Sequence, residues 1–158
     1  ASSKGFWAEM LGIGDFYYEL GVKIVEASLK LREQTGGLID LQTLKKKLVK
    51  GDQIEDDDIV KAIDTLKPLG SGFKVITIGK HKMVQSVPRE MSTDTTAVLN
   101  LADQRGFFTA DVIKSSLNWP EQRIDNCIDS LLSEGLVWID EQASPKQFWV
   151  PGLFAGIA

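Results

Sequence analysis

The chain has 158 residues, of which 43% are hydrophobic and 25% charged, and its formal net charge is −4. This composition is ordinary for a soluble globular protein. No segment approaches the roughly 20 consecutive apolar residues of a membrane helix, and none reads as a signal peptide. The single cysteine, Cys127, excludes a disulfide within the chain and is expected to be a buried apolar residue on a helix.

A pattern in the first half of the chain returns in the second half. Leucines, a glutamine and a glycine of residues 28–36 recur in register at residues 98–106. The apolar positions that follow recur as well. Because a repeat of this length is too long for a solenoid unit and suits a small domain, we predict two domains in tandem, residues 1–88 and residues 89–158.

The first copy is predicted to contain three helices and a hairpin. The predicted elements are helices over residues 15–34, 40–48 and 56–69 and strands over residues 73–78 and 82–87. Gly36 ends the first helix. Asp40 or Thr43 starts the second, and Gly79-Lys80-His81 forms the turn of the hairpin.

The second copy is predicted to have the same order. Its predicted elements are helices over residues 92–104, from Thr109, and from Pro120 to Gly135, and strands over residues 136–140 and 146–150. Thr109 suits an N-cap, and Pro120 suits a first helical turn because its missing N–H costs nothing there. Phe107-Phe108 is a short extended piece before the second helix.

Each copy is predicted to have three helices followed by a β-hairpin, and its second and third helices have helix-turn-helix spacing. This order of elements is that of a winged helix. The predicted fold class is therefore mainly α with small β-hairpins (α+β), arranged as two tandem winged-helix domains.

The charge of the third helices argues against nucleic-acid binding. A winged helix that reads DNA needs lysine and arginine to meet the phosphates. Each third helix instead carries three more acids than bases, counted over residues 55–67 and over residues 121–134. Such a helix repels a duplex. The only basic run is Lys45-Lys46-Lys47, which is either a phosphate or acidic-lipid contact or, as we favour, a solvated helix face.

Catalysis is not expected either, and neither is a metal or a cofactor. The only histidine, His81, lies in the predicted hairpin turn, where bulk water would surround it. A second imidazole and a Cys/His cluster are both missing, so no metal site can be assembled from them. The Gly12-Ile13-Gly14 segment lacks the preceding strand of a dinucleotide-binding loop.

The aromatic residues of the second copy are the candidate binding residues. Neighbours on a strand point to opposite faces, so Phe148 and Trp149 cannot both enter the core. Trp138 and Asp140, two residues apart, share a face. Either the tryptophans complete a small core, or an exposed aromatic pair rimmed by acids binds a protein partner.

The segment of residues 6–16 raises the same question, because it lies outside the repeat. Phe6, Trp7 and Phe16 either seal the contact between the two domains or dock another subunit.

Residues 5–21, GFWAEMLGIGDFYYELG, closely resemble the opening of the globular part of one family of ESCRT-II (endosomal sorting complex) subunits, the EAP-thirty or SNF-eight type, also called vacuolar protein sorting protein twenty-two. Further similar stretches are residues 36–39, 85–88 and 134–140. The similarity covers essentially the whole chain.

The resemblance implies a non-catalytic scaffold subunit that takes part in sorting ubiquitinated membrane proteins into multivesicular bodies. The implied partners are the related large ESCRT-II subunit and the small winged-helix subunit, with no nucleic acid. The implied location is the cytoplasm, with peripheral, indirect recruitment to the endosome membrane.

The resemblance also implies that the second winged helix receives the small subunit. We expect Trp138, Asp140, Phe148 and Trp149 to serve that contact, and Phe6, Trp7 and Phe16 to serve a contact between subunits or domains. The alternative is a winged-helix transcription-associated factor that binds nucleic acid or a polymerase complex.

Overall fold

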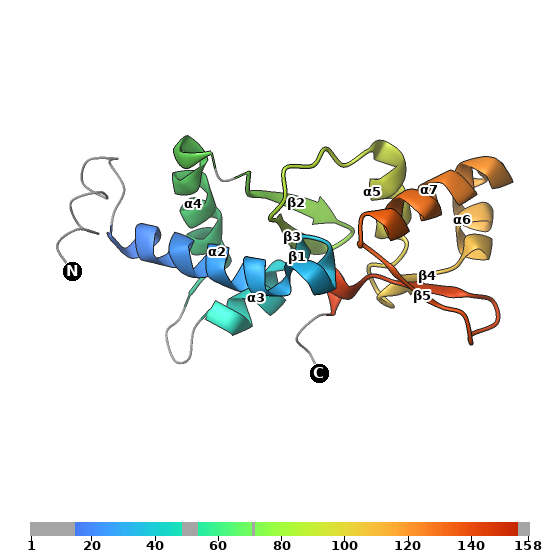
Figure 1. Cartoon of the computed structure of the whole chain (residues 1–158), viewed down its shortest axis with the longest axis horizontal. Coiled ribbons are helices and arrows are strands. Elements are labelled where there is room, and N and C mark those ends of the chain that lie inside the picture. The colour runs from blue at the N-terminus through green and yellow to red at the C-terminus, as the bar shows by residue number, and fades with distance from the viewer. Residues whose placement is uncertain (1–14, 49–53, 71, 155–158) are drawn as a thin grey trace.

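The computed structural model describes residues 15–48, 54–70 and 72–154. Its two halves are winged helices, side by side along the long axis of the molecule (Figure 1). The elements of the first winged helix are α2 (Asp15–Thr35), β1 (Leu38–Asp40), α3 (Leu41–Leu48), α4 (Asp56–Leu66), the 3-10 turn η1 (Lys67–Leu69), β2 (Lys74–Ile78) and β3 (His81–Gln85). The predicted order of three helices and a hairpin is confirmed.

The second winged helix repeats this order after a connection over residues 86–92. Its elements are α5 (Thr93–Asn100), β4 (Phe107–Phe108), α6 (Ala110–Leu117), α7 (Glu121–Ser133), β5 (Trp138–Asp140), β6 (Gln147–Trp149) and the 3-10 turn η2 (Pro151–Leu153). The fold class is confirmed, and the domain boundary after Pro88 stays a prediction.

Each winged helix contains a three-stranded antiparallel sheet, with strand order β1-β3-β2 in the first and β4-β6-β5 in the second. The wing hairpin supplies two strands, and the short strand before the second helix pairs with the last of them. The sequence pattern indicated β4 as an extended piece but missed β1. The partner of β1 is β3, more than 40 residues away, so no local periodicity reports the pairing.

Three helices, α3, α5 and α6, begin where a short polar side chain accepts a hydrogen bond from a free backbone N–H group. Asp40 Oδ2 accepts from Thr43 N at 3.1 Å, so Asp40 is the residue that starts α3. Thr109 Oγ1 accepts from Val112 N at 3.1 Å, as predicted for α6. Helix α5 is shorter than expected and ends at Asn100, and α4 ends at Leu66, where η1 takes over.

The first sheet buries apolar side chains on both faces. One face packs on the helices of the first winged helix through Ile39 and Val84. The opposite face carries Leu38, Ile78 and Met83, which belong to the same buried cluster as the core of the second winged helix. The two winged helices therefore share a hydrophobic core.

Two glycines allow the backbones of the two halves to meet. A Cβ on Gly152 of η2 would overlap the carbonyl oxygen of Leu38 in β1. A Cβ on Gly36 would come within 2.7 Å of the Gly135 carbonyl, and Gly36 also has φ +68°, which favours glycine. The C-terminal end of the described chain thus returns to the middle of the molecule beside β1 (Figure 1).

Within the described ranges, no helix is both long enough and apolar enough to cross a bilayer.

We expect Gly152→Ala to lower the free energy of unfolding by about 1–3 kcal/mol, because the added methyl must displace backbone rather than a flexible side chain. Gly21→Ala in α2 is the matched control, since its Cβ would meet only the side chain of Leu66, at 3.1 Å, and alanine favours a helix over glycine by about 1 kcal/mol. Urea denaturation measures both. Equal effects of the two substitutions would contradict the close backbone contact.

Candidate functional site

A row of aromatic side chains crosses the outer face of the second sheet. Phe107 on β4 lies opposite Trp149 on β6, and Trp149 lies opposite Trp138 on β5. Because strand neighbours alternate between faces, the adjacent row of Phe108 and Phe148 points inward and is buried. The prediction that Phe148 and Trp149 face opposite ways is therefore confirmed. Phe148, although expected at the partner contact, is a core side chain and is not assigned to that contact.

The aromatic row is packed at one end and open at the other. The Trp149 ring lies 4.8 Å from the Phe107 ring, centre to centre, and 5.6 Å from the Phe154 ring, which it meets nearly perpendicularly. The indole N–H of Trp149 donates to Gln147 Oε1 at 3.2 Å. Trp138 on the edge strand remains 50% exposed. The row, Phe107, Trp149, Trp138 and the adjoining Phe154, is called the aromatic face below.

Polar groups border the aromatic face on the wing side. Asp140 lies opposite Gln147, two positions along each strand from the Trp138–Trp149 pair, and so on the same face. Asp140 Oδ1 also accepts from the backbone N–H of Gln142 at 3.0 Å. This hydrogen bond fixes the carboxylate at the start of the wing turn.

A groove continues from the aromatic face along the β4 edge. It has a volume of about 530 Å³ and is lined by Phe107, Val112, Pro145 and Gln147, with Arg105 and Asp111 at its polar positions. Phe107 belongs to both the aromatic face and the groove, and Gln147 of the groove borders the aromatic face. The outer face of the sheet therefore offers flat aromatic contact, a recess and two opposite charges within one region.

The first sheet uses the equivalent face for its contact with the second winged helix. In the two repeats, Leu38 takes the place of Phe107 and Gln85 that of Trp149, and both are fully buried. The same side of the fold is thus covered in the first winged helix and uncovered in the second. At the positions of the second winged helix that correspond to Leu38, Gln85 and Lys74, the uncovered face carries aromatic residues. These are Phe107, Trp149 and Trp138.

Of the other predicted binding residues, the structure describes Phe16, which lies at the far end of the molecule on α2. Phe6 and Trp7 fall outside the described residues. Phe16 opens α2 and is 53% exposed, with its ring against the edge of Tyr17 at 5.1 Å. The Tyr17 hydroxyl donates to Asp58 on α4 at 3.3 Å. Tyr17 is thus tied to the fold, whereas Phe16 projects from it.

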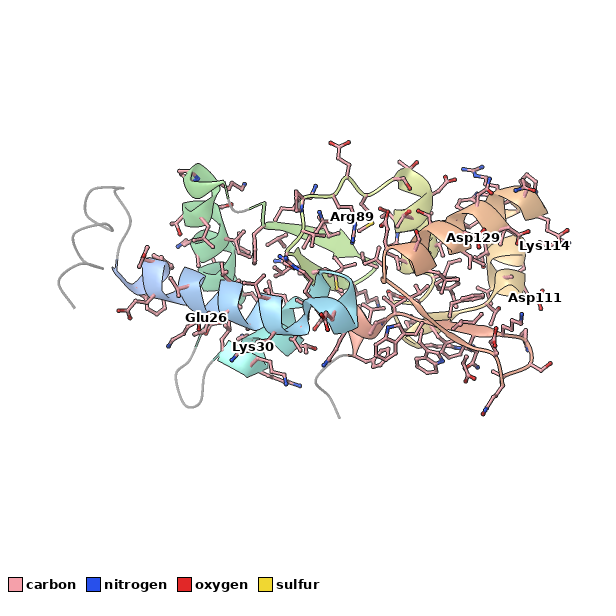
Figure 2. All side chains as sticks on the ribbon, in the orientation of Figure 1. Glu26, Lys30, Arg89, Asp111, Lys114 and Asp129 are labelled. Carbon is pink, nitrogen blue, oxygen red and sulfur yellow. The ribbon has the colours of Figure 1, made fainter. Side chains whose placement is uncertain are left out.

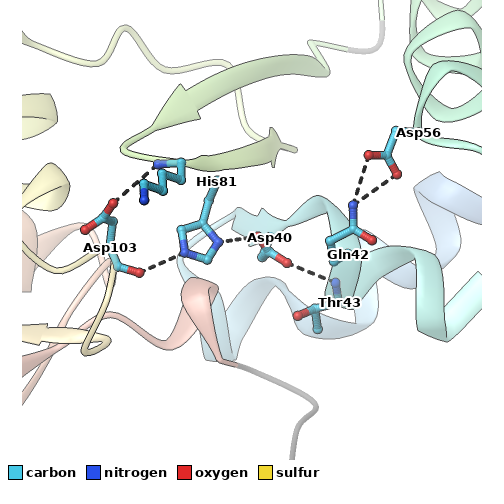
Figure 3. A network of polar contacts seen from close by, with 7 residues as sticks. Asp40, Gln42, Thr43, Asp56, His81 and Asp103 are labelled. Atoms are coloured by element: carbon cyan, nitrogen blue, oxygen red, sulfur yellow. Dashed lines mark hydrogen bonds and ion pairs between the residues drawn. The ribbon is translucent and has the colours of Figure 1, made fainter.

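The expectation that His81 faces bulk water is wrong. Its imidazole contacts Asp40 and the segment after α5, and its side chain is only 34% exposed. His81 is the first residue of β3, and the second winged helix covers it (Figure 3). In the described part of the chain, no three histidine, cysteine or acidic residues are grouped to hold a metal ion.

The acids of the two third helices differ in their partners. On α4, Asp56 accepts from Gln42 (Figure 3). Asp56 also pairs with Lys45 of α3 at 3.3 Å. On α7, the side chains of Asp125 and Asp129 are exposed, and Asp129 lies at the end of the molecule that also carries Asp111 and Lys114 (Figure 2). Lys46 and Lys47 are exposed as well.

Cys127 is buried on α7, as predicted. Burial raises the pKa of its thiol, so the group is a neutral core side chain and not a reactive thiolate.

Two residues of the aromatic face were not among the predicted site residues. Phe107 could have been found from its pairing alone, because strand alternation places it opposite Trp149 once Phe108 is assigned to the core. Phe154 carries no such signal, since it follows η2 and reaches Trp149 only through the tertiary fold.

Comparisons with family models, related sequences and solved structures all indicate the same family. A profile of the EAP30/Vps36 family matches residues 1–141. The chain is 50% identical to vacuolar-sorting protein SNF8 of Xenopus tropicalis and 46% identical to that of Homo sapiens, in each case over 99% of this chain and 63% of the relative. It is 45% identical to vacuolar protein sorting-associated protein 22 homolog 1 of Arabidopsis thaliana, over 96% of this chain.

The fold is also similar to chains in two solved structures. One is the ESCRT-II endosomal trafficking complex, with a TM-score of 0.80 at 32% identity over 89% of this chain and 66% of that one. The other is the endosomal complex ESCRT-II (VPS22/VPS25/VPS36), with a TM-score of 0.79 at 33% identity over 87% of this chain and 64% of that one. The chain spans about 63% of the length of the relatives named above.

We expect Trp138→Ala to change the free energy of unfolding by only about 0.5 kcal/mol, because the side chain is half exposed and lies on an edge strand. Phe148→Ala, on the neighbouring strand β6 but 6% exposed, should cost about 3–5 kcal/mol. Chemical denaturation of both variants checks this. A loss with Trp138→Ala as large as with Phe148→Ala would place Trp138 in the core and remove it from the site.

Proposed function

Because the chain belongs to the EAP30/Vps36 family, we propose that it is a non-catalytic scaffold subunit of an ESCRT-II complex. In this role it binds other winged-helix subunits, and the assembly sorts ubiquitinated membrane proteins into multivesicular bodies. The partners are a related large subunit and a small winged-helix subunit. The chain works in the cytoplasm and is recruited to the endosome membrane indirectly, through the complex.

The observation that carries the proposal is the aromatic face of the second sheet. Tryptophan is a favoured anchor at protein interfaces, where its area is buried at low entropic cost. Trp138 and Trp149 stand side by side there with Asp140 at their border. We assign this surface to the small winged-helix subunit, with Trp138 and Trp149 as anchors and Asp140 as the charge that orients the partner.

The contact inside the chain supports the same assignment. The first sheet already accepts a winged helix on its outer face through Leu38 and Met83. The second sheet has the same face, with larger aromatic side chains and nothing from the described chain covering Trp138. A further winged helix can therefore extend the row of domains in the same head-to-tail sense.

The opposite end of the molecule suits the related large subunit. Phe16 is exposed there, although its neighbour Tyr17 is fastened to α4. Phe6 and Trp7 precede it in the chain. We assign these three aromatic residues to the contact with the large subunit, which leaves the second winged helix free for the small one.

We expect Trp149→Ala or Asp140→Lys to weaken binding of the small winged-helix subunit by about 30-fold, the effect of losing one interface anchor worth about 2 kcal/mol. Leu29→Ala, which truncates an exposed leucine on α2, is the control and should bind like the parent chain. Calorimetric titration measures the affinity, and circular dichroism monitors the fold. Unchanged binding by both variants, or loss of their helical signal, would contradict the assignment.

The charge on α7 predicts that the chain does not bind a DNA duplex. Exposed Glu121, Asp125 and Asp129 would face the phosphates if α7 entered the major groove. A gel-shift titration at low salt should therefore show no complex. Tight binding that weakens as salt rises would instead favour the transcription-associated alternative.

A further inference from the structure

A single imidazole joins the two winged helices. His81 Nδ1 lies 2.9 Å from Asp40 Oδ1 in the first winged helix, and His81 Nε2 lies 2.8 Å from the carbonyl oxygen of Asp103, which follows α5 in the second (Figure 3). The ring therefore spans the contact between the two halves with one nitrogen on each side.

Both partners of the ring are acceptors. The carbonyl oxygen of Asp103 can only accept a hydrogen bond, so Nε2 must donate. The Asp40 carboxylate accepts from Thr43 N through its other oxygen, at 3.1 Å. A neutral imidazole has a single N–H and would turn a lone pair toward one of these oxygens. The geometry thus selects the imidazolium, which donates from both nitrogens.

The turn next to His81 is held by the same segment. Gly79 N donates to Asn100 Oδ1 at 2.7 Å, and Lys80 N donates to Asp103 Oδ2 at 3.3 Å. A Cβ on Gly79 would overlap the Asp103 side chain. The end of α5 and the residues after it therefore hold the backbone of the wing tip of the first winged helix. His81 adds two side-chain hydrogen bonds, which depend on its protonation state.

The charged groups around the ring favour the protonated form. Asp40 faces it from β1 and Asp103 from the segment after α5, whereas Lys80 of its own turn and Arg105 line the hollow beside it. The uncharged side chains of Leu153 and Phe154, at the end of the described part of the chain, also line this hollow. The carboxylate of Asp40 bonds the ring directly, and neither cation does so.

We propose that protonated His81 is a pH-dependent tie between the two winged helices, and that loss of its proton weakens the hold of the second winged helix on the wing tip of the first. The shared core and the backbone bonds of the turn stay in place. Proton uptake by His81 therefore stabilises the arrangement that places the aromatic face and Phe16 at opposite ends.

The direction of the pH dependence follows from the surroundings of His81. Burial lowers its pKa, but the hydrogen bonds to Asp40 and to the Asp103 carbonyl raise it, and the pKa ends above the ordinary 6.5. The folded state thus binds the proton more tightly than the unfolded chain. The stabilisation is fully present below about pH 6.5 and is lost as the pH rises through the folded pKa.

His81 is the only histidine of the chain, so its imidazole gives an unambiguous nuclear magnetic resonance titration. In the parent chain we expect its pKa above 6.5, with both ring nitrogens of the imidazolium type at pH values below the measured pKa. Asp40→Asn keeps an acceptor for Thr43 N but removes the charge, and it should weaken proton binding about tenfold, one pKa unit. Asp129→Asn, an exposed acid on α7, is the control and should leave the titration unchanged.

Stability is the second measurement. The free energy of unfolding of the parent chain, from urea denaturation, should fall as the pH rises through the measured His81 pKa, and His81→Gln should lack this fall. A pKa at or below 6.5 in the parent chain, or the same fall in His81→Gln, would overturn the proposal.

Discussion

Leu38 and Met83 point away from the helices of their own winged helix and into the core of the other. Burying one such side chain contributes about 1.5–3 kcal/mol, and a winged helix of this size has a small core of its own. The second winged helix gains part of its core from the first sheet, and η2 closes the contact at Gly152. The two repeats are consequently joined by packing as well as by the chain.

The same contact explains why the two sheets differ although their topologies agree. The outer face of the first sheet is occupied within the chain, so leucine, methionine and glutamine suit it. The outer face of the second sheet carries Phe107, Trp149 and Trp138 in the equivalent row, with half of the Trp138 side chain exposed. A repeated domain that docks head to tail leaves one such face free at the end of the row. That free face, and not a charged third helix, is the surface that we propose for partner binding.

Local patterns predicted what local forces determine. Helical spacing placed the long helices, and Asp40, Thr109 and Gly36 marked their ends because capping acts within a few residues. Strand alternation separated Phe148 from Trp149. The sequence could not predict β1, the shared core or the position of His81, because each depends on contacts across more than 20 residues. His81 in particular has the local context of an exposed turn, and only the approach of the segment after α5 makes it a partly buried group with two hydrogen-bond partners.

The central claim is that the two winged helices form one cooperative unit through the outer face of the first sheet. Native-state hydrogen exchange of the intact chain tests it most directly, because amides in one cooperative unit open with one free energy. The account predicts that the slowest amides of β3 and of α7 share the opening free energy of global unfolding. A second winged helix that opens at a clearly lower free energy, with β3 still protected, would contradict it.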